Sequence, residues 1–86
     1  MLTETSLLAY QEALLSLGEH QKEVLKCLRR LGQANNQMIA RTLRWQINSV
    51  TPRVKELRDK KLVKVAFEGP DLFTGRKTIY WEAIKK

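Results

Sequence analysis

The stretch NNQMIARTLRWQINSVTPRVKELRDKKLV, residues 35–63, decides the fold. Asn35 is a favourable N-cap for a short helix, which we predict over residues 36–43. Residues 44–46 form a tight turn, and a second helix then runs from residue 47 or 48 to about residue 60. Its apolar side chains recur three and four positions apart and therefore share one face: Ile47, Val50, Val54 and Leu57. The pattern predicts two helices joined at a short turn.

The side of the second helix that faces away from this stripe is polar and basic. At about 100° per residue, four side chains lie opposite the stripe and four on its flanks: Asn48, Pro52, Lys55 and Asp59, and Ser49, Thr51, Arg53 and Glu56. Such side chains at the start of a helix suit the major groove of DNA, where Asn pairs with adenine and Arg with guanine. We therefore assign DNA contacts to six residues of this helix: Asn48, Ser49, Thr51, Pro52, Arg53 and Lys55.

Four further cations are candidates for DNA contacts: Arg41, Arg44, Arg76 and Lys77. The first two are expected to reach phosphates where the first helix of the pair crosses the DNA backbone. The last two would reach a phosphate or the minor groove from the turn of a hairpin. Ordinary solvated charge is the alternative for all of them. Arg53 has a further alternative, a pair with Glu56, and the nearby Glu68 and Asp71 weaken the case for the hairpin.

Two helices are predicted before this pair. The first ends at Gly18 and carries a double row of leucines, which is wider than one packing surface needs. It either covers the domain's own helices or forms a two-fold contact in a homodimer. The second runs over residues 19–31 and stops at Gly32. By its length the chain is one domain, with three parts: an N-terminal helix (1–18), a three-helix core (19–60) and a hairpin (61–84).

After residue 60 the apolar period changes from that of a helix to that of a strand. Apolar residues alternate with polar or small ones in two runs, which we predict as strands: Val63, Val65 and Phe67, and Ile79, Trp81 and Ala83. A turn rich in glycine and proline over residues 69–75 joins the two strands into a hairpin. The expected fold class is therefore α+β and mostly helical, with a helix-turn-helix followed by a C-terminal β-hairpin.

The charge is strongly asymmetric along the chain. The formal net charge is +7, but residues 1–24 carry −3 and residues 25–86 carry +10. A concentrated positive field indicates a polyanionic partner or a membrane surface, with simple solubilising charge as the alternative. No predicted helix pairs a strongly basic face with a bulky apolar one, which argues against a membrane surface.

Several functions find no support in the residues. The chain contains no Cys/His cluster, no glycine-rich phosphate loop and no nucleophile–base set, so we expect no metal, no cofactor, no small-molecule ligand and no enzymatic activity. The single Cys27 is expected to be buried and suits a reducing cytoplasm, and His20 is expected at the surface. Trp45 and Trp81 are expected in the core rather than stacked on bases.

A family resemblance adds to these patterns. Residues 35–57 resemble the helix-turn-helix of winged-helix DNA-binding proteins, especially small phage or prophage proteins and more distantly MarR-type regulators. The segment 57–63, LRDKKLV, is similar to the step from recognition helix into wing in these families. The turn Thr74-Gly75-Arg76 and the late Trp81 resemble the wing of the phage group. The resemblance covers about residues 19–83 and implies a winged helix that binds duplex DNA, usually as a regulator.

The chain departs from the family pattern at two positions. Arg44 and Lys61 stand where glycine is usual, and both are expected to adopt a positive φ, which costs a non-glycine residue roughly 1 kcal/mol. The leading hypothesis is sequence-specific transcription regulation, with the recognition helix in the major groove and the wing on the flanking backbone. The alternative is a protein-interaction module without base readout, against which Arg53 and Lys55 argue. Binding of structured nucleic acid, as by Z-alpha-type winged helices, is disfavoured.

Overall fold

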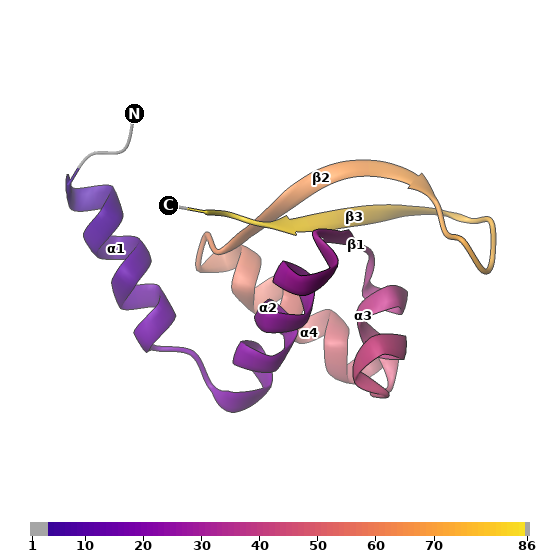
Figure 1. Ribbon diagram of the computed structural model, residues 1–86, viewed down its shortest axis with the longest axis horizontal. Helices are drawn as coiled ribbons and strands as arrows, with labels where there is room; N and C mark the ends of the chain where they lie inside the picture. The colour runs from indigo at the N-terminus through magenta and orange to yellow at the C-terminus, as the bar shows by residue number, and fades with distance from the viewer. Residues whose placement is uncertain (1–3, 86) are drawn as a thin grey trace.

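The computed structural model describes residues 4–85, and within this range the chain forms four helices and one three-stranded antiparallel sheet (Figure 1). The elements follow in this order: α1 (Glu4–Leu15), α2 (Glu19–Leu31), β1 (Gln33–Ala34), α3 (Asn36–Leu43), α4 (Ile47–Asp59), β2 (Val63–Pro70) and β3 (Lys77–Ala83). The predicted α+β, mostly helical class is confirmed. The predicted bounds of α2 and α3 are those of the structure.

The core lies between α2, α3, α4 and the inner face of the sheet. Leu31 and Leu43 are partly buried at its edge, and its centre is formed by fully or nearly fully buried apolar side chains of the three helices: Val24, Leu28, Ile39, Ala40, Val50, Val54 and Leu57. Ile47, the first position of the α4 stripe, is an exception because it lies at the exposed start of the helix. Trp81 and Cys27 are buried, and Trp45 is half-buried against the core, so these packing predictions hold.

The turn between α3 and α4 has the expected local geometry. The Asn35 side chain accepts a hydrogen bond from the Met38 N–H at 2.9 Å and caps α3. Arg44 adopts φ 61°, and Lys61 before β2 adopts φ 61° as well, which confirms both predictions of positive φ. The Trp45 N–H then donates to the Ala40 carbonyl at 2.9 Å, which closes the turn. This left-handed step sets the angle at which α4 leaves α3.

Pro52 is the sixth residue of α4, and the helix continues through it without a break. Because proline has no N–H, the carbonyl of Asn48 receives no donor from the residue four positions later. Both residues lie on the exposed side of α4, where that carbonyl is accessible to solvent. The helix therefore tolerates Pro52 on its outer face, where a buried unpaired carbonyl would be far more costly.

The sheet contains one strand that the sequence pattern did not predict. β1 has two residues and pairs with β3 through Gln33–Glu82 and Ala34–Trp81, which gives the strand order β1-β3-β2. The predicted alternation of β2 is wrong from Val65 onward. The pairing register with β3 shifts between Val65 and Phe67, so Ala66 is an extra residue. Val65 before the shift and Phe67 after it are both exposed rather than in the core.

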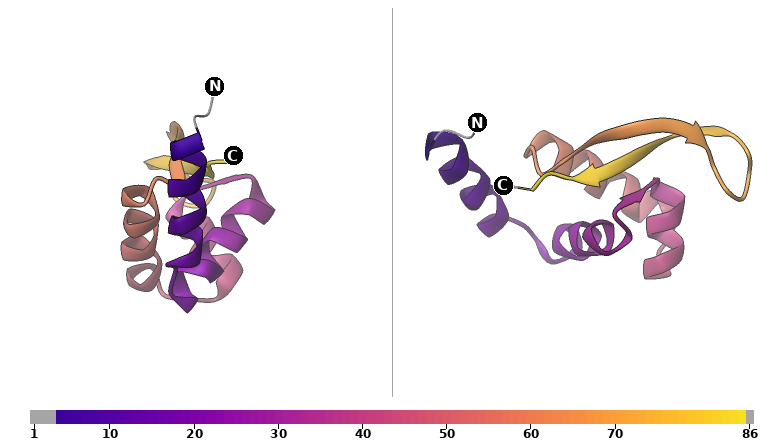
Figure 2. Two further views of the ribbon diagram at one scale, coloured as in Figure 1. Left: turned by 90° about the vertical axis from the view of Figure 1, so that its left-hand side faces the viewer. Right: turned by 45° about the horizontal axis from the view of Figure 1, so that its top comes forward.

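Helix α1 stands apart from the other elements (Figures 1 and 2). It ends at Leu15, three residues before the predicted end at Gly18. Gly18 instead precedes α2 as its N-cap, and its N–H donates to the Gln21 side chain at 3.0 Å. The Tyr10 hydroxyl joins α1 to the rest of the chain by donating to the Ile84 carbonyl at 3.0 Å. Leu14 of α1 packs against the core, whereas Leu7, Leu8 and Leu15 are exposed.

Candidate nucleic-acid interface

The outward side of α4 carries most of the predicted site. Its first two turns and the following residue hold five of the six assigned side chains, all exposed: Asn48, Ser49, Thr51, Pro52 and Lys55. These residues share one face because Val50, Val54 and Leu57 anchor the opposite face in the core. The Thr51 hydroxyl accepts a hydrogen bond from the Asn36 side chain at 3.4 Å, which links this face to the start of α3. The structure thus presents short polar side chains on a convex, uncovered helix.

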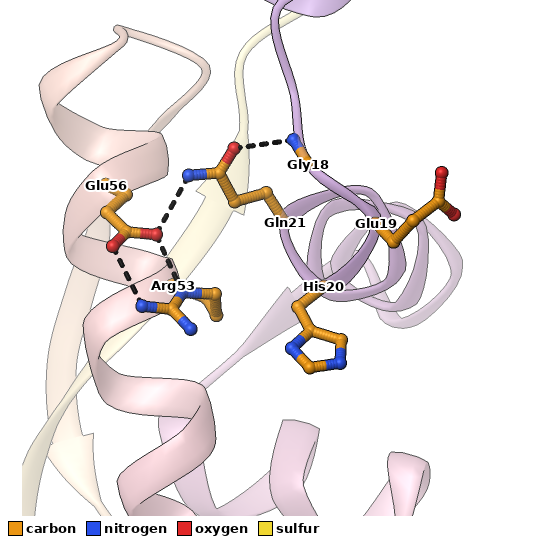
Figure 3. A pocket seen from close by; sticks show the side chains of 6 residues that line it. All are labelled: Gly18, Glu19, His20, Gln21, Arg53 and Glu56. Atoms are coloured by element: carbon orange, nitrogen blue, oxygen red, sulfur yellow. Dashed lines mark hydrogen bonds and ion pairs between the residues drawn. The ribbon is translucent and has the colours of Figure 1, made fainter.

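Arg53 differs from the other five because it is already paired. Its Nε donates to Glu56 Oε1 at 2.7 Å and its Nη2 to Glu56 Oε2 at 2.9 Å, the alternative that the sequence left open. The Gln21 side chain of α2 donates to the same Glu56 Oε1 at 2.8 Å. The side-chain oxygen of Gln21 in turn accepts a hydrogen bond from the Gly18 N–H (Figure 3). A continuous hydrogen-bonded chain therefore runs from the start of α2 to the middle of α4.

The Arg53–Glu56 pair stays ionised under ordinary conditions. The hydrogen bonds from Arg53 and then from Gln21 lower the pKa of Glu56, and the bond to Glu56 raises the pKa of Arg53. The pair borders an open cavity of about 430 Å³ that Gly18 and His20 also line (Figure 3). Arg53 lines this cavity, and Glu56 uses only two of the five N–H groups of its guanidinium.

The two cations near the turn take different positions. Arg44 is exposed at the C-cap of α3 and points away from the core. Arg41, in the last turn of α3, lies with its guanidinium carbon 3.7 Å from the centroid of the Phe73 ring. This cation–π contact holds Arg41 against the turn between β2 and β3, the hairpin that we call the wing. Arg41 and the wing therefore form one surface, although 32 residues separate Arg41 from Phe73.

The wing supplies the remaining two predicted cations, which are both exposed. Lys77 pairs with Glu68 across the hairpin at 3.2 Å, and Arg76 lies in the turn before β3. Arg76 and Lys77 both line a groove of about 460 Å³ between α3 and the wing. The other side chains that line this groove are polar, and one of them, Gln37, belongs to α3. An exposed ion pair of this kind is weak, so Lys77 can exchange Glu68 for a phosphate.

Asp71 has a structural role in the turn between β2 and β3 that sequence reasoning did not find. Its Oδ1 accepts the N–H groups of Phe73 at 2.8 Å and Thr74 at 2.9 Å, and its Oδ2 accepts the Asn35 side chain at 3.0 Å. These hydrogen bonds, first those from Thr74 and Phe73, lower the pKa of Asp71. The carboxylate thereby ties the wing turn to the N-cap of α3. The sequence signal was an Asx-turn pattern, Asp71 followed by Thr74 and Gly75.

Within residues 4–85, no three His, Cys, Asp or Glu side chains gather as a metal site would require. His20 is exposed and contacts Trp45 edge-to-face, with ring centroids 5.1 Å apart. Cys27 is a buried thiol whose pKa is raised by burial. None of the helices described here is long and apolar enough to cross a membrane.

The comparisons with known proteins now bear on this geometry. No protein-family model and no curated protein sequence matches the chain. Among solved structures, the chain is similar to one titled "Multiple Antibiotic Resistance Repressor, MarR", with a TM-score of 0.64 and 17% sequence identity. The fold is that of a winged helix. The match covers 90% of this chain and 54% of that one, so this chain spans about half of its length. At such low identity the likeness concerns the fold alone.

Proposed function

We propose that this chain binds double-stranded DNA at specific sequences and regulates transcription, with α4 in the major groove and the wing on the flanking backbone. The observation that carries the proposal is the outward face of α4, where Asn48, Ser49 and Thr51 stand exposed on a helix whose other face is fixed in the core. A helix presented in this way can reach base edges with its N-terminal half. The likeness to a repressor is consistent with this role.

The cations around α4 fit the two sides of a DNA duplex. Arg44 at the turn and Lys55 farther along α4 are exposed and suit phosphates on either side of the major groove. Arg76 and Lys77 occupy the wing, where they suit the neighbouring backbone. Arg53 enters this interface with Glu56 bound to it, so its net charge is compensated until Glu56 is displaced. We therefore assign base contacts first to Asn48, Ser49 and Thr51.

We further propose that α1 forms a two-fold contact between two copies of the chain. Its leucines Leu8 and Leu15 are exposed, and an isolated helix of this length gains most of its stability from packing. A dimer would place two α4 helices on half-sites about one DNA turn apart. The double substitution of Leu8 and Leu15 by Glu should convert a dimer into a monomer in sedimentation velocity. A wild-type chain that sediments as a monomer at high concentration would rule this contact out.

Selection of bound duplexes from a random pool, followed by sequencing, tests the proposed DNA binding. We expect an enriched motif, and a palindromic motif if the chain is a dimer. Asn48→Ala should then relax the preference at one base pair, whereas Lys55→Ala should weaken all duplexes alike and make the salt dependence shallower. An unenriched pool together with no binding at low salt would reject the proposal and favour a protein-interaction module. A regulator of this kind would act beside the genome, in the cytoplasm of a prokaryotic or phage-infected cell.

A further inference from the structure

The wing ends in two large apolar side chains that lie outside the core. Leu72 and Phe73 are 77% and 59% exposed at the turn between β2 and β3. This turn forms the outer end of the hairpin (Figure 1), and Phe73 contacts Arg41 of α3 there. Scattered apolar residues are common on protein surfaces, but two neighbours at the end of a projecting hairpin form a protruding apolar tip. We call Leu72 and Phe73 the wing tip.

The wing tip is held rigidly. The Asp71 carboxylate accepts the N–H groups of Phe73 and Thr74, and the Gly75 N–H donates to the Asp71 carbonyl at 2.9 Å. Gly75 closes the turn at φ 73°, a conformation that L side chains rarely adopt. Leu72 is therefore fixed between restrained neighbours. A rigid projection loses little conformational entropy when it is buried in a partner, so it is suited to insertion.

The surroundings of the wing tip are cationic. The Arg41 guanidinium lies on the Phe73 ring, and Arg76 is exposed three residues farther along the turn. The groove beside the tip is lined by Arg76 and Lys77. Two carboxylates lie close to these cations: that of Asp71 is occupied by its three hydrogen bonds, and that of Glu68 pairs with Lys77 at 3.2 Å. The partner that fits is a polyanion that can also accept an apolar side chain. Duplex DNA meets both conditions, because apolar side chains enter between base steps from the minor groove.

We propose that Leu72, with Phe73 beside it, is an apolar wedge that enters the minor groove and bends the duplex. This inference rests on the proposed function, and it adds a contact that carries no charge. Because Asp71 binds the N-cap of α3, the wedge stays at a fixed distance from α4. Wedges of this kind bend DNA toward the major groove, which would close the duplex around α4. Flexible TA or CA steps at the wedge would then be favoured without any polar contact to them.

Energy transfer across a bound duplex tests the wedge. The probe is a duplex of about 30 base pairs that carries the sequence enriched in the selection, with a donor and an acceptor dye at its ends. We expect the wild-type chain to raise the transfer efficiency by bending the duplex by at least about 20°. Leu72→Ala should lose most of this bend and bind about tenfold more weakly, because the buried apolar contact is removed.

Two matched variants separate the wedge from other effects. Val65→Thr makes polar an apolar side chain that is 45% exposed near the base of the same hairpin, and this variant should bend and bind as the wild type does. Arg76→Ala should make the salt dependence of log K shallower by about 0.9, whereas Leu72→Ala should leave that slope unchanged because it removes no phosphate contact. Exposed positions of this kind leave the melting temperature unchanged, so loss of folding does not imitate the result.

The outcomes distinguish this inference from the proposed function. If Leu72→Ala bends and binds the duplex as the wild type does, the wedge is wrong while DNA binding stands. If Val65→Thr has the larger effect, the base of the hairpin rather than the wing tip meets the DNA, and the wedge is again wrong. If the wild-type chain binds no duplex at low salt, the proposed function fails and the wedge fails with it.

Discussion

Replacement of Glu56 by Gln should leave Arg53 without the carboxylate that compensates its charge. Glu56 binds the Arg53 guanidinium through both of its oxygens, so the pair has no net charge. Glutamine keeps the length of the side chain and can still accept from Gln21, but it leaves the charge of Arg53 uncompensated. Arg53 lies on the flank of the α4 face that we propose as the DNA contact, so the freed charge should neutralise one more phosphate.

The size of this effect follows from counterion release. One additional phosphate contact steepens the plot of log K against log salt concentration by about 0.9. If counterion release contributes nothing at about 1 M salt, the contact strengthens binding about 15-fold at about 50 mM and about fourfold at about 200 mM. The gain should be the same for enriched and unrelated duplexes, since a phosphate carries no sequence information.

Fluorescence anisotropy titrations at several salt concentrations measure this change. The matched control is Glu82→Gln, which raises the net charge by the same single unit at the far end of β3, where Glu82 pairs with Lys64 at 3.6 Å. We expect the control to leave the slope unchanged. Equal slopes for wild type and Glu56→Gln, or the same steepening in both variants, would refute the placement of Arg53 at the interface.

Three predictions concern stability. Leu57→Ala, at the fully buried end of the α4 stripe, should lower the free energy of unfolding in urea by about 2–5 kcal/mol, and a loss under about 1 kcal/mol would contradict its place in the core. Lys61→Gly should raise that free energy by about 0.5–1 kcal/mol, because it relieves a φ of 61°; a decrease would contradict the strain. The pKa of Asp71 is lowered by its hydrogen bonds, so its contribution to stability is complete well above the ordinary value of 3.8 and is lost as the pH falls through the folded-state pKa. Asp71→Asn should therefore show a smaller fall in melting temperature between neutral pH and about pH 3 than the wild type, and an equal fall would contradict the role of the carboxylate.

The helix-turn-helix could be predicted because its determinants are local. The N-cap Asn35 lies next to the helix it caps, the α4 stripe recurs at the helical period, and Arg44 sits where the turn needs a left-handed residue. The Arg53–Glu56 pair was foreseen as an alternative for the same reason, since three residues along a helix bring side chains together. Short-range spacing thus carries most of the candidate site.

The features that were missed depend on residues far apart in the sequence. β1 has two residues, too few to show any period, and forms because β3 offers it an edge. The extra residue Ala66 in β2 is defined only by the partner strand. The contact of Asp71 with Asn35 spans 36 residues, and Gln21 reaches Glu56 across 35. No local pattern reports such pairings, because the tertiary fold brings them together.

Amide NMR shifts during titration with the enriched duplex test the central claim most directly, since they report both binding and its location. We expect the largest shifts at Ser49 and Thr51 of α4 and at Phe73 of the wing turn, with the amides of the α2 core little changed. The same titration at high salt should reduce the shifts together, as phosphate contacts are lost. Saturating shifts confined to α1, or none at all at low salt, would contradict the claim that the α4 face and the wing bind DNA.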